Sequence, residues 1–240
     1  MEPILFVRAD YDETFGVAPA AFAEIDRATT VWDAIGGEPV PDLGDVSAVI
    51  VFGSAFNTEH ADEQPFLYGV REVIQQTLER RLPYLGICFG AQALAWSLGS
   101  SVHRAPVREI GFVPIRRTAA AAADPFLDLL VDGEPAFQWH MDTFELPDGA
   151  VLLATNDTVA NQAFRLGDRT WATQFHFEVD RSEIEAWIAG FGDEALDTEW
   201  GRSAEDLRAE AVALGDAHEE RGRRLFQRFA ELVATATTTT

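Results

Sequence analysis

Cysteine and lysine are the scarcest residues of this 240-residue chain. Its one cysteine is Cys88, and every Lys/Arg position is an arginine. A single thiol can form neither an intramolecular disulfide nor a thiolate metal cluster. No apolar run reaches the length of a membrane span, and the first residues lack the basic start and apolar core of a signal peptide. We therefore expect a cytoplasmic protein.

Positive charge is scarce as well. Forty acidic residues against 18 basic ones give a formal net charge of −22. So negative a chain repels phosphate backbones and anionic lipids, which argues against nucleic acid or membrane as a partner. High negative charge also favours solubility in concentrated salt. A salt-adapted source and an ordinary acidic protein both fit this composition.

Apolar residues are plentiful, at 47% of the chain, so a sizeable core is expected. Short apolar runs alternate with longer helical patterns up to about residue 180, which indicates an α/β sheet. The expected strands are residues 4–8, 47–52, 83–87, 111–116, 151–155, 158–165 and 170–175. The expected helical segments are residues 18–29 (helical or irregular), 64–81, 91–98, 182–189 and 203–233. We predict one domain over residues 1–181 and a helical C-terminal extension, residues 182–240, packed on it.

The strongest local motif is Gly-Ile-Cys-Phe-Gly at residues 86–90, between an expected strand and an expected helix. A nucleophile on such a turn adopts a sparsely populated backbone conformation, which requires small neighbours on both sides. The positive end of the following helix favours a thiolate at Cys88. The backbone N–H of Phe89 is placed to donate to an oxyanion. A lone cysteine can also be a plain buried residue, but the two glycines favour the nucleophile.

A cysteine nucleophile requires a base, and His176 is the leading candidate. It stands two residues before Glu178 at the end of an apolar strand, and positions i and i+2 share a face of an extended segment. Glu178 can then orient one ring nitrogen while the other faces the thiol. An isolated His-x-Glu is common, and His140 remains a competitor. We expect His218, which lies among charged residues, to be solvated.

A second oxyanion donor is usually required. The strand over residues 47–52 ends at Gly53-Ser54, and a glycine-containing turn at the end of a parallel strand is a natural source of that donor. Alone, this feature is ordinary turn chemistry.

Together these features resemble the class I, triad-type glutamine amidotransferases, the family that includes the glutaminase domain of GMP synthase. The likeness runs in order through residues 86–92, 138–150 and 174–178 and covers roughly residues 1–180. Residues 110–112 and 222–226 also look like the stand-alone members. The expected fold is a doubly wound, mostly parallel α/β sheet flanked by helices, with the site at the carboxyl ends of central strands.

The resemblance implies that Cys88 attacks the side-chain amide of glutamine, with His176 as base and Glu178 as its orienter. It further implies a set of oxyanion and substrate-binding residues: Gly53, Ser54, Phe89, Gln92, Trp139, His140 and Met141. No metal and no cofactor is expected. The ammonia would pass to an acceptor, such as a synthetase subunit, that the sequence does not name.

Departures from the family pattern affect substrate choice more than chemistry. Ser54-Ala55 replaces the usual Gly-Pro, Ala91 a frequent His, and Phe177 a usual Pro. A γ-glutamyl hydrolase or transferase with the same triad is the rival enzyme. A non-catalytic regulatory subunit is the rival of another class, and the intact Cys, His and Glu favour an enzyme over it.

Overall fold

The computed structural model describes residues 2–11 and 14–238. Its strands are β1 (Ile4–Arg8), β2 (Thr29–Asp33), β3 (Ala48–Val51), β4 (Tyr84–Ile87), β5 (Val102–Pro114), β6 (Arg116–Arg117), β7 (Pro135–Phe144), β8 (Ala150–Thr155), β9 (Ala163–Leu166) and β10 (Thr170–Thr173). Eight of them form one sheet in the order β2-β1-β3-β4-β10-β9-β8-β6. From β2 to β10 the neighbours are parallel, and from β10 to β6 they are antiparallel.

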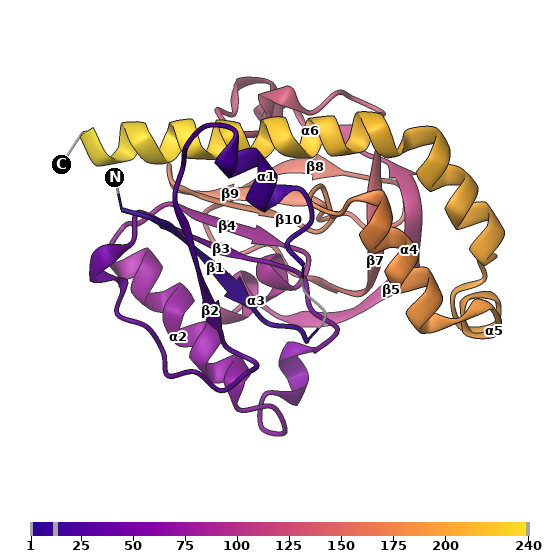
Figure 1. The fold of residues 1–240 in the computed structure, drawn as a ribbon, viewed down its shortest axis with the longest axis horizontal. Coiled ribbons are helices and arrows are strands. Elements are labelled where there is room, and N and C mark those ends of the chain that lie inside the picture. Colours follow the sequence, from indigo (N-terminus) through magenta and orange to yellow (C-terminus); the bar gives the residue numbers. More distant parts are fainter. Residues whose placement is uncertain (1, 12–13, 239–240) are drawn as a thin grey trace.

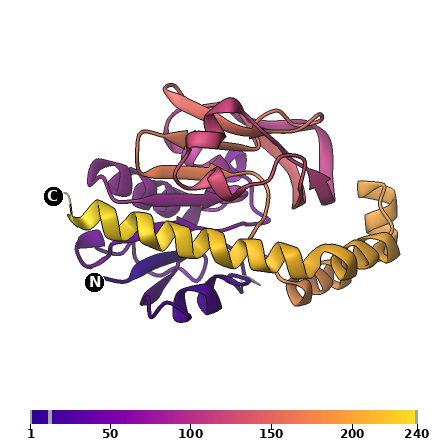
Figure 2. The same cartoon turned by 90° about the horizontal axis from the view of Figure 1, so that it is seen from above.

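The helices are α1 (Ala18–Ala23), α2 (Phe66–Glu79), α3 (Phe89–Ser97), α4 (Arg181–Phe191), α5 (Asp193–Ala195) and α6 (Ala204–Thr238). Single turns are η1 (Leu43–Asp45), η2 (Thr58–His60), η3 (Ala119–Ala123), η4 (Leu127–Leu129) and the π-helical η5 (Leu196–Trp200). Helices α1 and α6 cover one face of the sheet, and α2 and α3 cover the other (Figures 1 and 2). Across residues 2–11 and 14–238, no helix combines the length and apolar character that crossing a membrane requires.

Strand β1 illustrates why the central strands are apolar throughout. Ile4 and Phe6 belong to the core under α1 and α6, whereas Leu5 and Val7 belong to the core under α2 and α3. Successive side chains point to opposite faces, and here both faces are covered by helices. The sequence-based prediction of a mostly parallel sheet flanked by helices, with a helix-rich C-terminal segment, is confirmed.

Helix α6 contributes to the sheet's core although it is rich in charged residues. Its apolar residues Leu225, Phe226 and Phe229 are fully buried. The Phe226 ring lies 5.5 Å from that of Phe22 in α1 and 5.0 Å from that of Phe177. The backbone of α6 also comes close to the segment after β10, since a Cβ atom on Gly222 would overlap the carbonyl oxygen of Phe177.

Strands β5 and β7 form a separate two-stranded antiparallel sheet, which differs from the sequence-based expectation. We expected a strand only at residues 111–116, yet β5 begins at Val102, and β7 was not expected as a strand. The apolar residues of this ribbon pack against α4, η5 and the start of α6, which close over it.

Two further expectations about strands were wrong. The predicted strand over residues 158–165 begins only at Ala163, because the Asn156 side chain accepts hydrogen bonds from the backbone N–H groups of Thr158 and Val159 and holds a turn there. The edge strand β2 was also missed. Three of its five side chains are exposed, so it lacks the apolar character of the central strands.

Candidate active site

The turn between β4 and α3 holds Cys88 in a strained backbone conformation. Its φ of 50° and ψ of −104° lie in a region that residues with a Cβ rarely adopt. Both flanking glycines are required by close contacts. A Cβ on Gly86 would stand 2.6 Å from the carbonyl carbon of Gly90, and a Cβ on Gly90 would overlap the carbonyl oxygen of Val51 in β3. The turn therefore packs against both its own strand and the neighbouring one.

Cys88 is the N-cap residue of α3, and 5% of it is exposed. Its backbone N–H donates to Thr173 at the end of β10, which fixes the turn to that strand. The side-chain amide of Gln174 donates to the sulfur at 3.6 Å. The sulfur therefore lies at the N-terminus of a helix, which carries partial positive charge.

The segment after β10 brings a histidine and a carboxylate to this sulfur. Nδ1 of His176 lies 2.5 Å from Oε1 of Glu178, and both side chains are 3% exposed. The backbone N–H of His176 donates to Phe137 in β7 at 2.8 Å, which anchors the extended segment. Alternation along that segment places the two side chains on one face, as the sequence predicts.

The electrostatics of His176 favour its protonated form. Burial alone would lower its pKa, but the charges of Glu178 and Cys88 and their hydrogen bonds to the ring outweigh burial and raise the pKa well above 6.5. Since Nδ1 faces Glu178, the Nε2 atom is left for the contact with Cys88. The imidazole therefore has the Glu178 carboxylate on its Nδ1 side and Cys88 on its other side.

The end of β3 borders the histidine and the cysteine. A Cβ on Gly53 would stand 2.9 Å from Cε1 of His176 and 4.0 Å from Cβ of Cys88. The Ser54 hydroxyl donates to the Ala9 carbonyl at 2.8 Å and accepts from the Phe56 N–H at 3.0 Å, which fixes the turn.

Two backbone donors are left over near the sulfur. Among the described residues, the N–H groups of Ser54 and Phe89 have no hydrogen-bond acceptor. Both are therefore free to bind an oxygen atom from outside the protein.

The predicted substrate-binding residues on β7 divide between its two faces. His140 is buried between Oε2 of Glu109 and the Asp142 carbonyl oxygen, each 3.0 Å from a ring nitrogen. Trp139 and Met141 are half-buried on the opposite face. Gln92 is 5% exposed, and its amide nitrogen donates to the Asp142 carbonyl at 3.1 Å.

Sequence reasoning missed Gln174 and Trp187. Positions i and i+2 share a face of an extended segment, which groups His176 with Glu178 and equally places Gln174 on that face. The alternation along the sequence was therefore enough to find Gln174. The Trp187 ring of α4 lies edge-on to the His176 ring at 5.2 Å and links it to Trp139, 5.7 Å further on. Nothing in the local sequence of α4 points to that contact.

Sequence reasoning was wrong about His218. It is 1% exposed, and burial, followed by the charge of Arg221, lowers its pKa to about 3. Its ring packs on Phe112 at 5.3 Å. Although its sequence neighbours are charged, the helical period turns this position towards the sheet.

A buried carboxyl group, Glu183, lies close to the segment that carries His176 and Glu178. Its Oε1 accepts from the Thr14 hydroxyl at 2.6 Å. Burial, together with the charge of Glu178, raises the pKa of Glu183 to about 7, although the bond from Thr14 and the charge of His176 act in the opposite direction. The group is therefore part of the electrostatic surroundings of the histidine–carboxylate pair.

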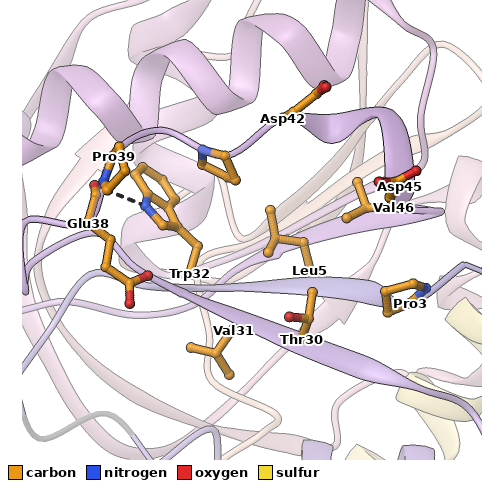
Figure 3. Close-up of a pocket in the computed structure, with 11 residues that line it drawn as sticks. Pro3, Leu5, Thr30, Val31, Trp32, Glu38, Pro39, Asp42, Asp45 and Val46 are labelled. Carbon is orange, nitrogen blue, oxygen red and sulfur yellow. Dashed lines mark hydrogen bonds between the residues drawn. The ribbon is translucent and has the colours of Figure 1, made fainter.

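A hollow elsewhere on the molecule contains none of the candidate residues. It lies beside β2 and is lined by Trp32, Val31 and a proline-rich loop (Figure 3). The Trp32 indole N–H there donates to the Glu38 carbonyl. This hollow is therefore separate from the candidate site around Cys88.

Comparison with known proteins gives one family and a consistent set of relatives. The family model described as "Glutamine amidotransferase class-I" matches residues 28–191. A protein named "GMP synthase [glutamine-hydrolyzing]" from Porphyromonas gingivalis is 35% identical over 144 residues, which are 59% of this chain and 27% of that protein. The chain thus spans about a quarter of the length of that relative.

Two further relatives match more of the chain. A glutamine amidotransferase-like protein, YfeJ, from Salmonella typhimurium is 28% identical over 193 residues, which cover 77% of this chain and 81% of that protein. A crystal structure of a glutamine amidotransferase from Thermotoga maritima superposes with a TM-score of 0.86 at 29% identity and covers 96% of this chain and 98% of that one.

Proposed function

Because this chain belongs to the class-I glutamine amidotransferase family, we propose that it hydrolyses the side-chain amide of glutamine to glutamate and ammonia. The observation that carries the proposal is the buried pair of His176 and Glu178 at 2.5 Å, which stands across Gly53 from the strained turn that holds Cys88. In this proposal Cys88 is the nucleophile, His176 the acid and base, and Glu178 the group that orients the imidazole.

The first half-reaction releases ammonia. The Cys88 thiolate attacks the carboxamide carbon, and the carbonyl oxygen becomes an oxyanion that accepts hydrogen bonds from the N–H groups of Phe89 and Ser54. His176, as imidazolium, then gives its proton to the departing nitrogen. The C–N bond breaks, and a γ-glutamyl thioester remains on the sulfur.

The second half-reaction regenerates the thiolate. His176, now neutral, takes a proton from a water molecule that attacks the thioester carbon. When the C–S bond breaks, glutamate leaves and the thiolate is again paired with the imidazolium. Glu178 accepts the hydrogen bond from Nδ1 throughout, so that Nε2 is always the nitrogen that exchanges protons.

Substrate binding is assigned to residues around this centre. Gly53 leaves room for the histidine ring beside the oxyanion site, and Trp139, His140 and Met141 border the substrate. The side-chain oxygen of Gln92, which accepts no hydrogen bond from the described residues, is the group of that side chain left for the substrate.

The proposal extends to the fate of the ammonia. The name of the Porphyromonas relative, a glutamine-hydrolysing GMP synthase, supports an ammonia-accepting synthetase as a partner. The partner can be sought by assaying ammonia release from glutamine with and without a cell extract.

We further propose that the protein is cytoplasmic, and that residues 1–181 form the amidotransferase domain on which residues 182–240 pack.

Replacing the thiol tests the proposed function. Wild-type protein should release glutamate and ammonia in equal amounts, and Cys88→Ala should release neither while unfolding at the same temperature. An electrophilic glutamine analogue should label Cys88 in the wild type. Turnover of other γ-glutamyl amides, but not of glutamine, would point to the rival hydrolase. Turnover by the alanine variant would exclude Cys88 as nucleophile.

A further inference from the structure

The buried ring of His140 is one end of a hydrogen-bonded network near the proposed site. Both ring nitrogens face groups that accept hydrogen bonds: Nε2 faces Oε2 of Glu109 and Nδ1 faces the Asp142 carbonyl, each at 3.0 Å. The ring is therefore held between a carboxylate oxygen and a backbone carbonyl oxygen.

Glu109 holds the other side of that ring. Its oxygens accept further hydrogen bonds from the amides of Asn156 and Gln162, each at 2.8 Å, and from the Thr158 hydroxyl. Burial would raise the pKa of Glu109, but the hydrogen bonds from His140 and Thr158 and the positive charge of His140 lower it. The carboxylate is therefore ionised, and the pair is fully hydrogen-bonded within the protein.

The Asp142 carbonyl extends this network towards the sulfur. Besides the His140 proton it accepts a hydrogen bond from Nε2 of Gln92 at 3.1 Å. The same Nε2 donates to Oε1 of Gln174 at 3.2 Å, and Nε2 of Gln174 donates to Sγ of Cys88 at 3.6 Å. All the side chains along this path are buried.

The direction of the hydrogen bonds is fixed from one end. A backbone carbonyl can only accept, so Gln92 must turn its NH₂ group towards Asp142. That NH₂ group also faces Gln174, which must therefore present its oxygen to Gln92 and its own NH₂ group to the sulfur. If the Gln174 amide were reversed, its NH₂ group would face the NH₂ group of Gln92, and its oxygen would face the Cys88 sulfur.

We propose that Gln174 is a positioning residue that donates a hydrogen bond to the Cys88 thiolate, in an orientation set by Gln92 and the Asp142 carbonyl. This inference rests on the proposed function, in which that sulfur is the nucleophile. Donation from a neutral amide stabilises the anion without supplying a proton that the anion could take. The hydrogen bond from Gln174 therefore keeps the sulfur in its reactive form when no substrate is bound.

The uniqueness of Cys88 allows a test that does not depend on turnover. Iodoacetamide alkylates thiolates, and this protein has no other cysteine, so the alkylation rate against pH reports on this sulfur alone. Gln174→Met keeps the length of the side chain and removes the donor. It should slow alkylation at pH 7 about tenfold and move the half-maximal rate to higher pH, since hydrogen bonds to charged groups are worth roughly this much.

Gln138→Met is the matched control. Gln138 is equally buried and donates to Gln162 at 2.8 Å, but it has no contact with the sulfur. Its alkylation profile should equal that of the wild type. An unchanged profile in folded Gln174→Met, or the same shift in both variants, would overturn the proposal in favour of a purely structural network.

A double-variant cycle tests whether Gln92 acts on the sulfur through Gln174. Gln92→Met should slow alkylation through the loss of orientation at Gln174, so the variant with both changes should be no slower than Gln174→Met alone. Additive losses would mean that Gln92 does not act through Gln174. In turnover, Gln174→Met should lower kcat about tenfold with KM unchanged. A wild type without glutaminase activity would overturn the proposed function, whereas the alkylation profile would still decide this inference.

Discussion

The backbone of Gly53 lies against the edge of the His176 ring, so that a Cβ atom at Gly53 would stand 2.9 Å from Cε1 of the imidazole. Observed Cβ contacts are almost never that short. The end of one parallel strand thus limits where the histidine of another segment can stand, and it does so without a hydrogen bond.

Gly53→Ala should therefore impair catalysis more than stability. The added methyl group pushes the imidazole away from its position near the sulfur, and a displacement of about 1 Å in a catalytic group reduces rates roughly 100-fold. Steady-state kinetics should show the loss in kcat. Gly190→Ala in α4 is the control, because nothing lies within 4 Å of its added Cβ. A Gly53→Ala enzyme as fast as this control would contradict the assignment.

Glu178→Gln should lower glutamine turnover by roughly two to four orders of magnitude, because the imidazole loses its orienting carboxylate. It should also change the dependence of stability on pH. The raised pKa of His176 stabilises the fold fully below pH 6.5, and this contribution is lost as pH rises through the folded-state pKa. The melting temperatures of wild type and variant should therefore differ most near pH 6 and converge at alkaline pH. A difference that grows with pH would reject the ion pair.

Glu183 predicts a second dependence on pH. Its pKa is raised from 4.5 to about 7, so the native state holds a proton that the unfolded state releases first. Stability should fall between about pH 4.5 and 7, by up to about 3 kcal/mol at 1.36 kcal/mol per pKa unit. Glu183→Gln should flatten this part of the curve. Chemical denaturation at pH 5 and pH 8 measures this loss of unfolding free energy. An equal loss in wild type and Glu183→Gln would rule out the buried carboxyl as the cause.

The net charge of −22 predicts stabilisation by salt. Repulsion among exposed carboxylates is screened over about 10 Å at 0.1 M ionic strength, so the melting temperature should rise as sodium chloride is added from a very low concentration. Potassium chloride should act equally if screening is the cause. A flat profile would mean that the charges are already compensated, and the salt-adapted interpretation should then be dropped.

The sequence predicted the elements whose cause is local. Strand β1 was predicted at its observed bounds because both faces of it are apolar, and α2 because its apolar residues recur at helical spacing. Strand β7 was missed for the opposite reason. Its residues Gln138, His140 and Asp142 are polar and yet buried, because partners far away in sequence satisfy their hydrogen bonds. The hydropathy pattern of residues 135–144 cannot reveal those long-range hydrogen-bond partners.

The same division applies to the candidate site. The elbow around Cys88 and the spacing of His176 and Glu178 are local patterns, and the sequence was enough to propose them. The neighbourhood of Trp187 and the burial of His218 depend on how α4 and α6 pack on the sheet. Charged neighbours in sequence made His218 look solvated, whereas the helix turns its ring towards Phe112 and the interior.

The parallel pairing of β4 with β10 has a consequence for folding. Gln174, directly after β10, contacts Cys88, directly after β4, across 86 positions of the chain. Such non-local pairings form late, because a long loop must close first. A nascent chain that has not yet delivered β10 therefore has none of Gln174, His176 and Glu178 beside Cys88. On the proposed mechanism, the thiol acquires its base and its hydrogen-bond donor only when this long-range pairing has formed.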